Sequence, residues 1–382
     1  MATAMYSGGP FRVLVVGLGG TGGLLAAGLA AQGHDVFGIT RQGRVADAVE
    51  ADGFATRGFV ALGSVRGRAA TAVGRREDPF DFVLVAVPGP LVAQAAQRHA
   101  RHLALEGRMV VFANGGGEAT VAQHVGADRT LGCIATWTTR MPAPGVYEQT
   151  SASASFILGR VTVGSAEEDP WLRGLSVSLE ALGPVATTDD LTGARRTALV
   201  LDSALTVLLT TGDRPLGDLM YHRFARRLAL ELVSEAAGVA QTRGASLPRL
   251  DGTPDLHRLR LAADDLRSGD DNARRRPDTT PDDYLRAVGR RYLRTSPRRS
   301  PDHAANLLQP MLTAARAVGM TLPVHEAFAA ALRAGAVGLD TLERVYLQSQ
   351  PADPPKAPAG DTNTLGSTDD VSERSAPPEP QT

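Results

Sequence analysis

The chain has 382 residues, more than one typical domain, and its 43% hydrophobic and 21% charged residues are ordinary for a globular protein. Its 40 basic and 41 acidic residues nearly cancel, so charge gives no reason to expect nucleic acid or an anionic membrane as a partner. Cys133 is the only cysteine, which excludes an internal disulfide and fits a reducing compartment. It lies in an apolar run, where we expect a buried hydrophobe rather than a nucleophile.

The sequence shows no targeting or membrane-spanning segment. Residues 1–10 lack the basic region and apolar stretch of a signal peptide, and no uninterrupted apolar segment approaches 18 residues. We therefore expect a cytoplasmic protein without a membrane partner.

Short apolar runs alternate with segments of helical length through the first half of the chain. The runs expected to form buried strands are 11–16, 35–40, 82–87, 108–113 and 131–135, and residues 22–32 have helical spacing. Turn signals at 142–145 and the stretch 153–163 predict antiparallel strands that close the sheet. The alternation predicts a Rossmann-type, doubly wound α/β domain over residues 11–190, after an extension of residues 1–10.

From Leu191 onward the pattern predicts helices only. They are expected at 194–211, 223–243, 280–294, 304–318, 323–334 and 339–347. Residues 191–349 would then form an all-helical domain that carries a charged, partly ordered insertion at 250–279. Residues 350–382 are rich in Pro, Ser, Thr and Asp and predict a disordered tail.

A glycine motif directly follows the first predicted strand. It comprises Gly17, Leu18, Gly19, Gly20, Thr21 and Gly22, the spacing GxGxxG. In such a motif the first glycine permits a tight turn, the second lets the backbone approach a pyrophosphate, and the third lets the helix pack closely on the strand. Between a strand and a helix, this motif predicts a dinucleotide site.

The end of the second predicted strand indicates which dinucleotide binds. An NAD site usually places an Asp or Glu there, but this chain has Arg41 and, three residues on, Arg44. A guanidinium can bind a 2′-phosphate through paired hydrogen bonds. We therefore predict NADP(H) as the cofactor and no metal, although Arg41 could also be an ordinary surface arginine.

With these residues in view, the chain resembles the ketopantoate reductase (2-dehydropantoate 2-reductase) family from about Phe11 to Leu347. Besides the glycine motif and Arg41, the resemblance rests on five segments: Asn114-Gly115-Gly116-Gly117, Trp137-Thr138-Thr139, Pro144-Gly145-Val146, Pro215-Leu216-Gly217-Asp218-Leu219 and Ala315-Arg316-Ala317-Val318-Gly319. The resemblance implies reduction of a 2-oxo acid with NADPH between two domains, by a monomer or homodimer.

The resemblance also implies site residues. Asn114 matches an asparagine beside the nicotinamide and the substrate, although a plain turn-forming Asn-Gly is the alternative. An ungapped alignment of the long helix puts Ala198 at the position of the family's catalytic lysine, with Asp202 and Thr206 at two asparagine positions. Asp302 or His303 falls where the family has a substrate-binding glutamate. Glu235 keeps a family acidic position, for which a structural hydrogen bond is an equal explanation.

Loss of the lysine leaves three hypotheses open. The chain could be an NADPH-dependent reductase of another small carbonyl or imine, with Asp202, Thr206, Asn114 and Asp302 or His303 lining its cleft. It could be a true 2-oxo acid reductase whose active site is misaligned, or an inactive NADP(H)-binding regulatory or scaffold protein. Asp202 could act as an acid or stabilise a cationic substrate if it is buried. Alternatively, it could cap or hydrogen-bond locally, or pair with an arginine such as Arg195 or Arg196.

Overall fold

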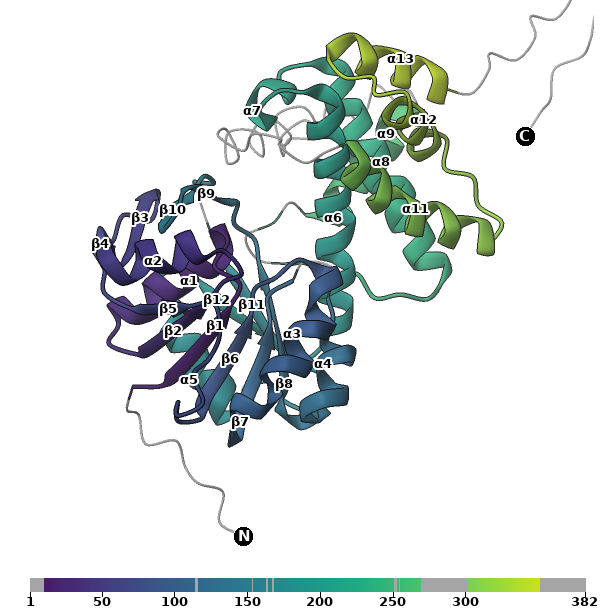
Figure 1. The fold of residues 1–382 in the computed structure, drawn as a ribbon. Coiled ribbons are helices and arrows are strands. Elements are labelled where there is room, and N and C mark those ends of the chain that lie inside the picture. The colour runs from purple at the N-terminus through teal and green to yellow at the C-terminus, as the bar shows by residue number, and fades with distance from the viewer. Residues whose placement is uncertain are drawn as a thin grey trace, which may run out of the picture. The chain divides into compact units, whose positions relative to one another are not determined.

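A computed structural model describes residues 10–113, 116–152, 154–162, 164–166, 168–250, 253, 255–268 and 301–350. The first half of the described chain is built around a sheet of eight strands in the order β12-β11-β8-β7-β6-β1-β2-β5 (Figure 1). The strands are β1 (Arg12–Val16), β2 (Asp35–Ile39), β5 (Arg68–Ala70), β6 (Phe80–Val85), β7 (Leu103–Val111), β8 (Thr130–Ala135), β11 (Phe156–Arg160) and β12 (Val185–Thr188). β11 pairs antiparallel with β8 and parallel with β12, so these two strands run opposite to the other six.

Helices cover both faces of this sheet because alternate strand residues are apolar on both sides. On one face, Val13 and Val15 pack with α1 (Gly20–Ala31), α2 (Gly43–Asp52) and α5 (Pro170–Leu179). On the other face, Leu14 and Val16 pack with α3 (Val92–His99) and α4 (Glu118–Val125). Strands buried on both sides read as continuous apolar runs, which is the pattern seen in the sequence. The doubly wound α/β prediction is therefore confirmed.

A second, four-stranded sheet lies against α1. Its order is β4-β3-β10-β9, with β3 (Phe54–Gly58), β4 (Ser64–Val65), β9 (Thr139–Ala143) and β10 (Val146–Gln149). The ring of Tyr147 in β10 occupies the place where a side chain at Gly23 of α1 would lie. The prediction that the turn at 142–145 joins strands closing the main sheet is thus wrong, because β9 and β10 pair in this second sheet while β11 alone joins the main one.

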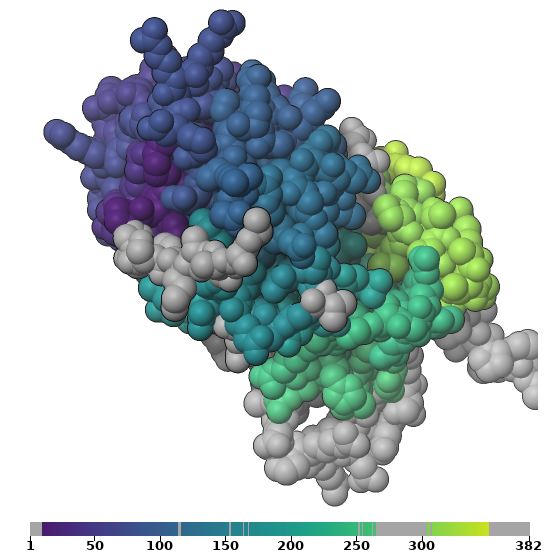
Figure 2. Space-filling view, turned by 90° about the horizontal axis from the view of Figure 1, so that it is seen from below, coloured from purple at the N-terminus to yellow at the C-terminus, as the bar shows by residue number. Residues whose placement is uncertain are grey.

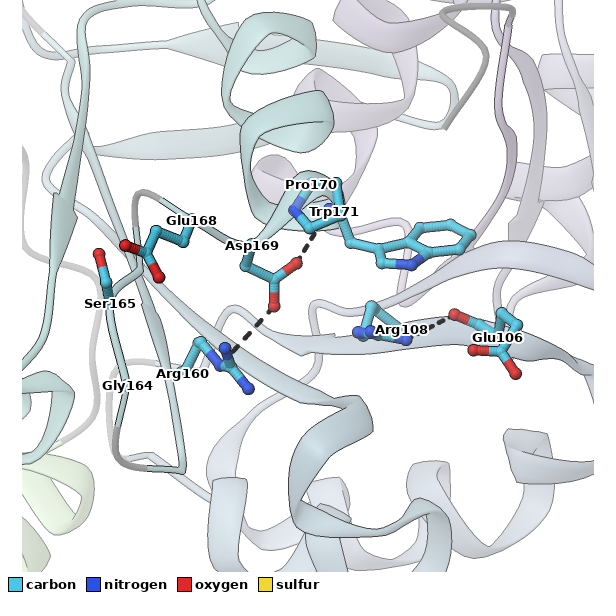
Figure 3. Close-up of a pocket in the computed structure, with 9 residues that line it drawn as sticks. All are labelled: Glu106, Arg108, Arg160, Gly164, Ser165, Glu168, Asp169, Pro170 and Trp171. Carbon is cyan, nitrogen blue, oxygen red and sulfur yellow. Dashed lines mark hydrogen bonds and ion pairs between the residues drawn. The ribbon is translucent and has the colours of Figure 1, made fainter. Parts of the chain in front are cut away.

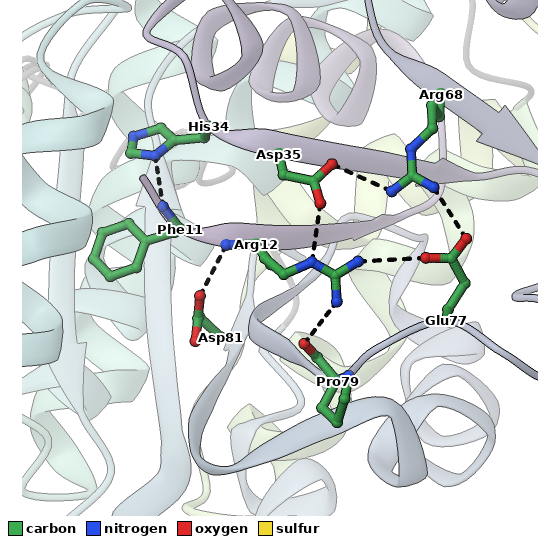
Figure 4. Close-up of polar contacts among 8 residues, drawn as sticks. All are labelled: Phe11, Arg12, His34, Asp35, Arg68, Glu77, Pro79 and Asp81. Carbon is green, nitrogen blue, oxygen red and sulfur yellow. Dashed lines mark hydrogen bonds and ion pairs between the residues drawn. The ribbon is translucent and has the colours of Figure 1, made fainter. Parts of the chain in front are cut away.

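Ion pairs fasten the amino ends of the central strands together. The guanidinium of Arg12 in β1 bonds the carboxylate of Asp35 in β2 at 2.9 Å and that of Glu77 at 3.4 Å, and Arg68 in β5 bonds the same two acids (Figure 4). Partial burial opposes the charge of Asp35, but the hydrogen bonds from Arg12 and Arg68 hold its pKa below the usual value. These contacts lie at the amino edge of the sheet and leave the opposite, carboxyl edge free for the glycine turn.

The described C-terminal half is helical, as predicted. Its elements are α6 (Leu191–Gly212), α7 (Leu216–Leu219), α8 (Arg223–Thr242), α9 (Leu256–Ser268), α11 (Pro301–Ala317), α12 (Pro323–Arg333) and α13 (Leu339–Ser349). They share one apolar core of leucine, valine and alanine side chains around Phe328. The described residues up to Ser349 form one compact unit, and Figure 2 shows part of their surface. The expected helix at 280–294 and the tail beyond Gln350 lie outside the described residues.

Helix α9 falls inside the segment that the sequence presented as a charged insertion. Leu256, Leu259 and Ala263 are buried in the core of the helical half. Their spacing of three and four residues places them on one helix face, and this periodicity was hidden by the charged residues between them. The first part of the predicted insertion is therefore a packed helix.

His99 at the end of α3 gives the fold a defined acid sensitivity. Its side chain is 4% exposed, and burial, with help from the nearby His102, Arg98 and Arg101, lowers its pKa to about 4. Because the unfolded state binds a proton near pH 6.5 and the native state does not, this histidine removes stability as the pH falls from 6.5 towards 4.

At pH 5 that loss amounts to about 2 kcal/mol. We expect His99→Gln to reduce the fall in the free energy of urea unfolding between pH 7 and pH 5 by about this amount, since glutamine does not titrate. His124→Gln, at an exposed position on α4, should keep the wild-type dependence. An unchanged pH dependence in His99→Gln would show that His99 is not protonated on unfolding.

Candidate cofactor and active site

The glycine motif forms the turn between β1 and α1, at the carboxyl edge of the sheet. Gly17 has a φ of +102°, and its N–H donates to the Ile39 carbonyl at 2.8 Å. A Cβ at Gly17 would lie 2.7 Å from the Ala86 carbonyl oxygen, and one at Gly22 would overlap the Gly17 oxygen. By contrast, a Cβ at Gly19 would meet no heavy atom within 4 Å. The first and third glycines are thus needed for packing, whereas the second faces open space.

The start of α1 has the properties of an anion site. Gly19 is its N-cap and supplies no capping side chain, and the first turn holds no acidic residue. The first N–H groups of a helix lack partners within the helix and carry the positive end of its dipole. Backbone amides, an open approach at Gly19 and no competing carboxylate together fit a pyrophosphate. The residues present therefore fit the phosphates of a dinucleotide.

The start of β9, which follows β8 in the chain, packs against this turn. The sequence did not predict this contact. The hydroxyls of Thr21 and Thr139 are 3.1 Å apart, and a Cβ at Gly20 would lie 2.7 Å from the Arg140 nitrogen. Thr139 belongs to the Trp-Thr-Thr segment noted in the sequence, which therefore supports the glycine turn. Its neighbour Trp137 is buried against the Phe156 ring.

Arg41 stands just past the end of β2 with an exposed side chain. Within the described residues it has no hydrogen-bond or ion-pair partner, whereas the guanidinium of Arg44 bonds the side chain of Gln42 at 3.2 Å. A 2′-phosphate or water can therefore reach the guanidinium of Arg41 without displacing an internal carboxylate. The choice between NADP(H) and NAD(H) stays a prediction.

Helix α6 is buried along most of its length but has one open stripe. Between Thr197 and Gly212, the residues that are not buried are Ala198, Leu199, Asp202 and Leu205, at the spacing of one helix face. Asp202, the predicted catalytic residue, is half-buried, so the full burial on which its role as an acid was argued is not observed. Thr206 is 6% exposed. The stripe presents apolar surface around one carboxylate.

The other predicted catalytic residues cannot be placed against this stripe. Asn114 lies outside the described residues, and Asp302 and His303 belong to the first turn of α11 without described side chains. The structure therefore brings the cofactor residues Gly17 to Gly22 into one turn, with Arg41 at the next strand end. The grouping of the catalytic residues stays a prediction.

A buried ion pair joins α6 to the carboxyl edge of the sheet. The Arg195 Nε donates to the Glu118 carboxylate at 2.7 Å, and its Nη2 donates to the Val111 carbonyl at 2.7 Å. Both side chains are about nine-tenths buried. A Cβ at Gly132 would come within 2.5 Å of the Glu118 oxygen, so that glycine makes room for the pair. Arg195, which the sequence offered as a local partner for Asp202, is thus held by Glu118.

Two other residues singled out in the sequence have structural roles. The carboxylate of Glu235 in α8 accepts hydrogen bonds from the backbone N–H groups of Val324 and His325 at 2.9 and 3.1 Å, and from the His325 ring at 2.6 Å. It therefore caps α12, which is the structural role expected under one of the two explanations given for it. Cys133 is fully buried in β8, and burial raises the pKa of its thiol, which disfavours a nucleophilic role.

Among the described residues, no group of His, Cys, Asp or Glu side chains could hold a metal ion, and no helix is long and apolar enough to cross a membrane. One cavity near Trp171 is lined by residues of β7, β11 and α5, at the amino edge of the sheet. It is therefore separate from the glycine turn.

Comparisons with known proteins agree with this geometry. Residues 13–163 match the model of the family described as ketopantoate reductase PanE/ApbA. The α/β half of the chain is therefore similar to that family. The match spans the α/β half only as far as β11, so it contains the glycine turn, Arg41 and Glu118 but not α6. No curated protein matches the chain.

Solved structures match over most of the chain. A D-mandelate dehydrogenase with NADH and anilino(oxo)acetate superposes with a TM-score of 0.65 at 14% identity, covering 87% of this chain and 99% of its own. The 2-dehydropantoate 2-reductase from Porphyromonas gingivalis W83 gives 0.61 at 16% identity, covering 85% and 100%. A PanE/ApbA family ketopantoate reductase from Ralstonia eutropha JMP134 gives 0.59 at 20%, covering 87% and 99%. At these identities the comparisons show a shared fold.

The two kinds of glycine in the turn can be separated by mutation. We expect Gly19→Ala to fold normally, because its φ of −80° suits alanine and its Cβ meets no atom, yet to weaken NADPH binding by about tenfold because the methyl group obstructs the pyrophosphate. The measurement is a fluorescence titration with NADPH alongside a thermal melt. Gly74→Ala, in an exposed loop, is the control and should change neither. Wild-type affinity in Gly19→Ala would show that the phosphates bind elsewhere.

Proposed function

We propose that this chain is an NADPH-dependent reductase of a C=O or C=N group in a small substrate other than ketopantoate. The observation that carries the proposal is the open, uncapped glycine turn at the carboxyl end of β1, with the exposed Arg41 at the end of β2. The turn supplies amides for a pyrophosphate, and the guanidinium favours the phosphorylated nucleotide. When bound, NADPH supplies a hydride. NADH, present in the D-mandelate dehydrogenase complex, is the alternative cofactor.

The sequence itself argues against the standard ketopantoate mechanism. The family resemblance implies a lysine as the proton donor, but the chain contains one lysine, Lys356, within the predicted tail. No shift of the alignment can therefore bring a lysine onto α6. Hydride addition to a carbonyl creates an alkoxide that needs a proton, and one general acid accounts for roughly two to four orders of magnitude in rate. A different group must donate that proton, or the substrate must not need it.

Asp202 is the residue we propose for this role. It is the one charged side chain on the open stripe of α6 between Thr197 and Gly212. Because Asp202 is only half-buried, its first proposed role is to stabilise an iminium cation as a carboxylate before hydride addition; protonation of a carbonyl oxygen is the alternative role. The apolar neighbours Leu199 and Leu205 would contact the hydrocarbon part of the substrate. Asn114, Thr206 and Asp302 or His303 complete the proposed site.

A 2-oxo acid reductase is the second candidate. Arg196 is exposed on α6, two residues before the open stripe, and offers a guanidinium to a substrate carboxylate. This reaction would follow the chemistry named for the structural neighbours, a mandelate dehydrogenase and ketopantoate reductases. In either case we expect the chain to act as a monomer or homodimer in the cytoplasm.

Turnover of NADPH and NADH with cyclic imines, ketones and 2-oxo acids, including ketopantoate, tests the proposal. We expect turnover of an imine or a non-acidic ketone, and a fall of about two to four orders of magnitude in kcat for Asp202→Asn at unchanged NADPH affinity. Asp218→Asn, at an exposed position on α7, is the matched control and should keep wild-type kinetics.

Each other outcome selects a different function. Efficient reduction of ketopantoate would establish the second candidate, and an unchanged rate in Asp202→Asn would remove that residue from the mechanism. Tight NADPH binding without turnover of any compound would instead favour an inactive, cofactor-binding regulatory protein.

A further inference from the structure

A cavity of about 370 Å³ opens at the amino edge of the main sheet (Figure 3). Its walls come from the start of β7, the end of β11 and the start of α5, and the side chains that matter here are Arg108, Arg160, Asp169 and Trp171. Arg108 pairs in register with Phe82, and Phe82 pairs with Val13 near the start of β1. The glycine turn begins four residues further along β1, roughly 13 Å away along the strand. The cavity is therefore distinct from the proposed cofactor site.

Arg108 has one hydrogen-bond donor, Nε, that bonds to none of the described residues. Its guanidinium stacks on the Trp171 ring at 5.2 Å, and Nη1 donates to the Glu106 carbonyl at 2.5 Å. The Nε is buried and has no hydrogen-bond partner among the described residues. A buried donor without a partner costs about 1–3 kcal/mol, so such a group usually meets a water, an ion or a ligand.

Arg160 faces the same cavity and is only loosely neutralised. Its Nε lies 3.7 Å from the Asp169 carboxylate and its Nη2 lies 4.0 Å from the carboxylate of Asp128, both beyond hydrogen-bond distance. The Asp169 carboxylate is already used as the N-cap of α5, where it accepts from the N–H groups of Trp171 and Leu172 at 2.9 and 3.2 Å.

Burial and the neighbouring arginines act against the positive charge of Arg108. Burial is the main cause that lowers the pKa of Arg108; the carboxylates of Asp169 and Glu106 oppose this shift, and Arg160 and Arg129 add repulsion in the same direction as burial. The side chains of Glu106 and Glu168 also line the cavity, but they are exposed, so solvent screens their charges. An oxyanion between the two guanidiniums would offset their mutual repulsion.

We propose that this cavity is a second ligand site, which binds the phosphate or carboxylate group of a small metabolite between Arg108 and Arg160. A guanidinium pair suits an oxyanion because each planar fork can donate two parallel hydrogen bonds. The Trp171 ring, already stacked on Arg108, offers an apolar wall to the rest of the molecule. The site is independent of the reductase activity proposed above.

The test is a titration of the wild-type protein with inorganic phosphate and, separately, with succinate, followed by tryptophan fluorescence. The chain has two tryptophans, and Trp137 is buried away from this cavity, so Trp171→Phe should abolish the signal. We expect saturable binding of at least one anion at millimolar concentration, and the stronger of the two tells whether the natural group is a phosphate or a carboxylate.

Arg160→Gln should weaken this binding at least tenfold, and Arg108→Gln, which also removes the stacking on Trp171, provides a second variant. Arg173→Gln, at an exposed position on α5, is the matched control and should bind as wild type does. Because phosphate could also occupy the glycine turn, the titration is repeated with saturating NADPH, where we expect no change. The proposal would be overturned if the wild-type protein gave no saturable signal, if both arginine variants kept the wild-type signal, or if saturating NADPH abolished it.

Discussion

The close approach of α1 to β1 is the constraint on which the rest of the structure depends. It exists because Gly22 has no side chain to collide with the Gly17 carbonyl, and because Gly17 can adopt a positive φ against the Ala86 backbone. The approach aims the first amides of α1 at the carboxyl edge of the sheet. It also fixes α1 so that Gly23 can receive the Tyr147 ring of the second sheet. The close packing of α1 on β1 therefore leaves the first backbone N–H groups of α1 exposed to an anion at the carboxyl edge of the sheet.

An ion pair and a hydrogen bond of Arg195, rather than close packing at a glycine, connect α6 to the carboxyl edge of the main sheet. Arg195 of α6 reaches the Val111 carbonyl at the end of β7 and the Glu118 carboxylate at the start of α4. Buried pairs of this kind fix geometry more than they add stability. Its position one turn before Ala198 places the open stripe of α6 just beyond the sheet edge. The ion pair would therefore position the proposed active site at Asp202.

The central strands of the main sheet and the long helices could be predicted because their signals are local. Short apolar runs mark β1 and β2, and helical spacing marks α6 and α8. Short elements such as β4 and β5 were missed because two or three residues carry no periodicity. The β9–β10 hairpin was recognised by its turn but assigned to the wrong sheet, since partner choice depends on the contact of Tyr147 with α1, which is distant in sequence.

In the candidate site, too, contiguous residues could be predicted from the sequence, whereas contacts between distant residues could not. The cofactor turn is contiguous, so six residues in a row define it, and the structure shows why the first and third glycines are required. The ion pair of Arg195 with Glu118 joins residues 77 positions apart, so no local pattern in the sequence predicts it. Gly132 leaves the space that the Glu118 carboxylate occupies. The cavity at Arg108 and Trp171 is lined by three elements that are distant in sequence, and no sequence motif predicts it.

A calorimetric titration with NADPH and NADH tests whether the glycine turn holds a dinucleotide whose 2′-phosphate meets Arg41. We expect NADPH to bind at least about tenfold more tightly than NADH, as for one charge-assisted phosphate contact. We also expect Arg41→Gln to remove this preference, whereas Arg66→Gln, at another exposed arginine, should keep it. Failure of both nucleotides to bind, or a preference for NADPH that persists without Arg41, would contradict this binding mode.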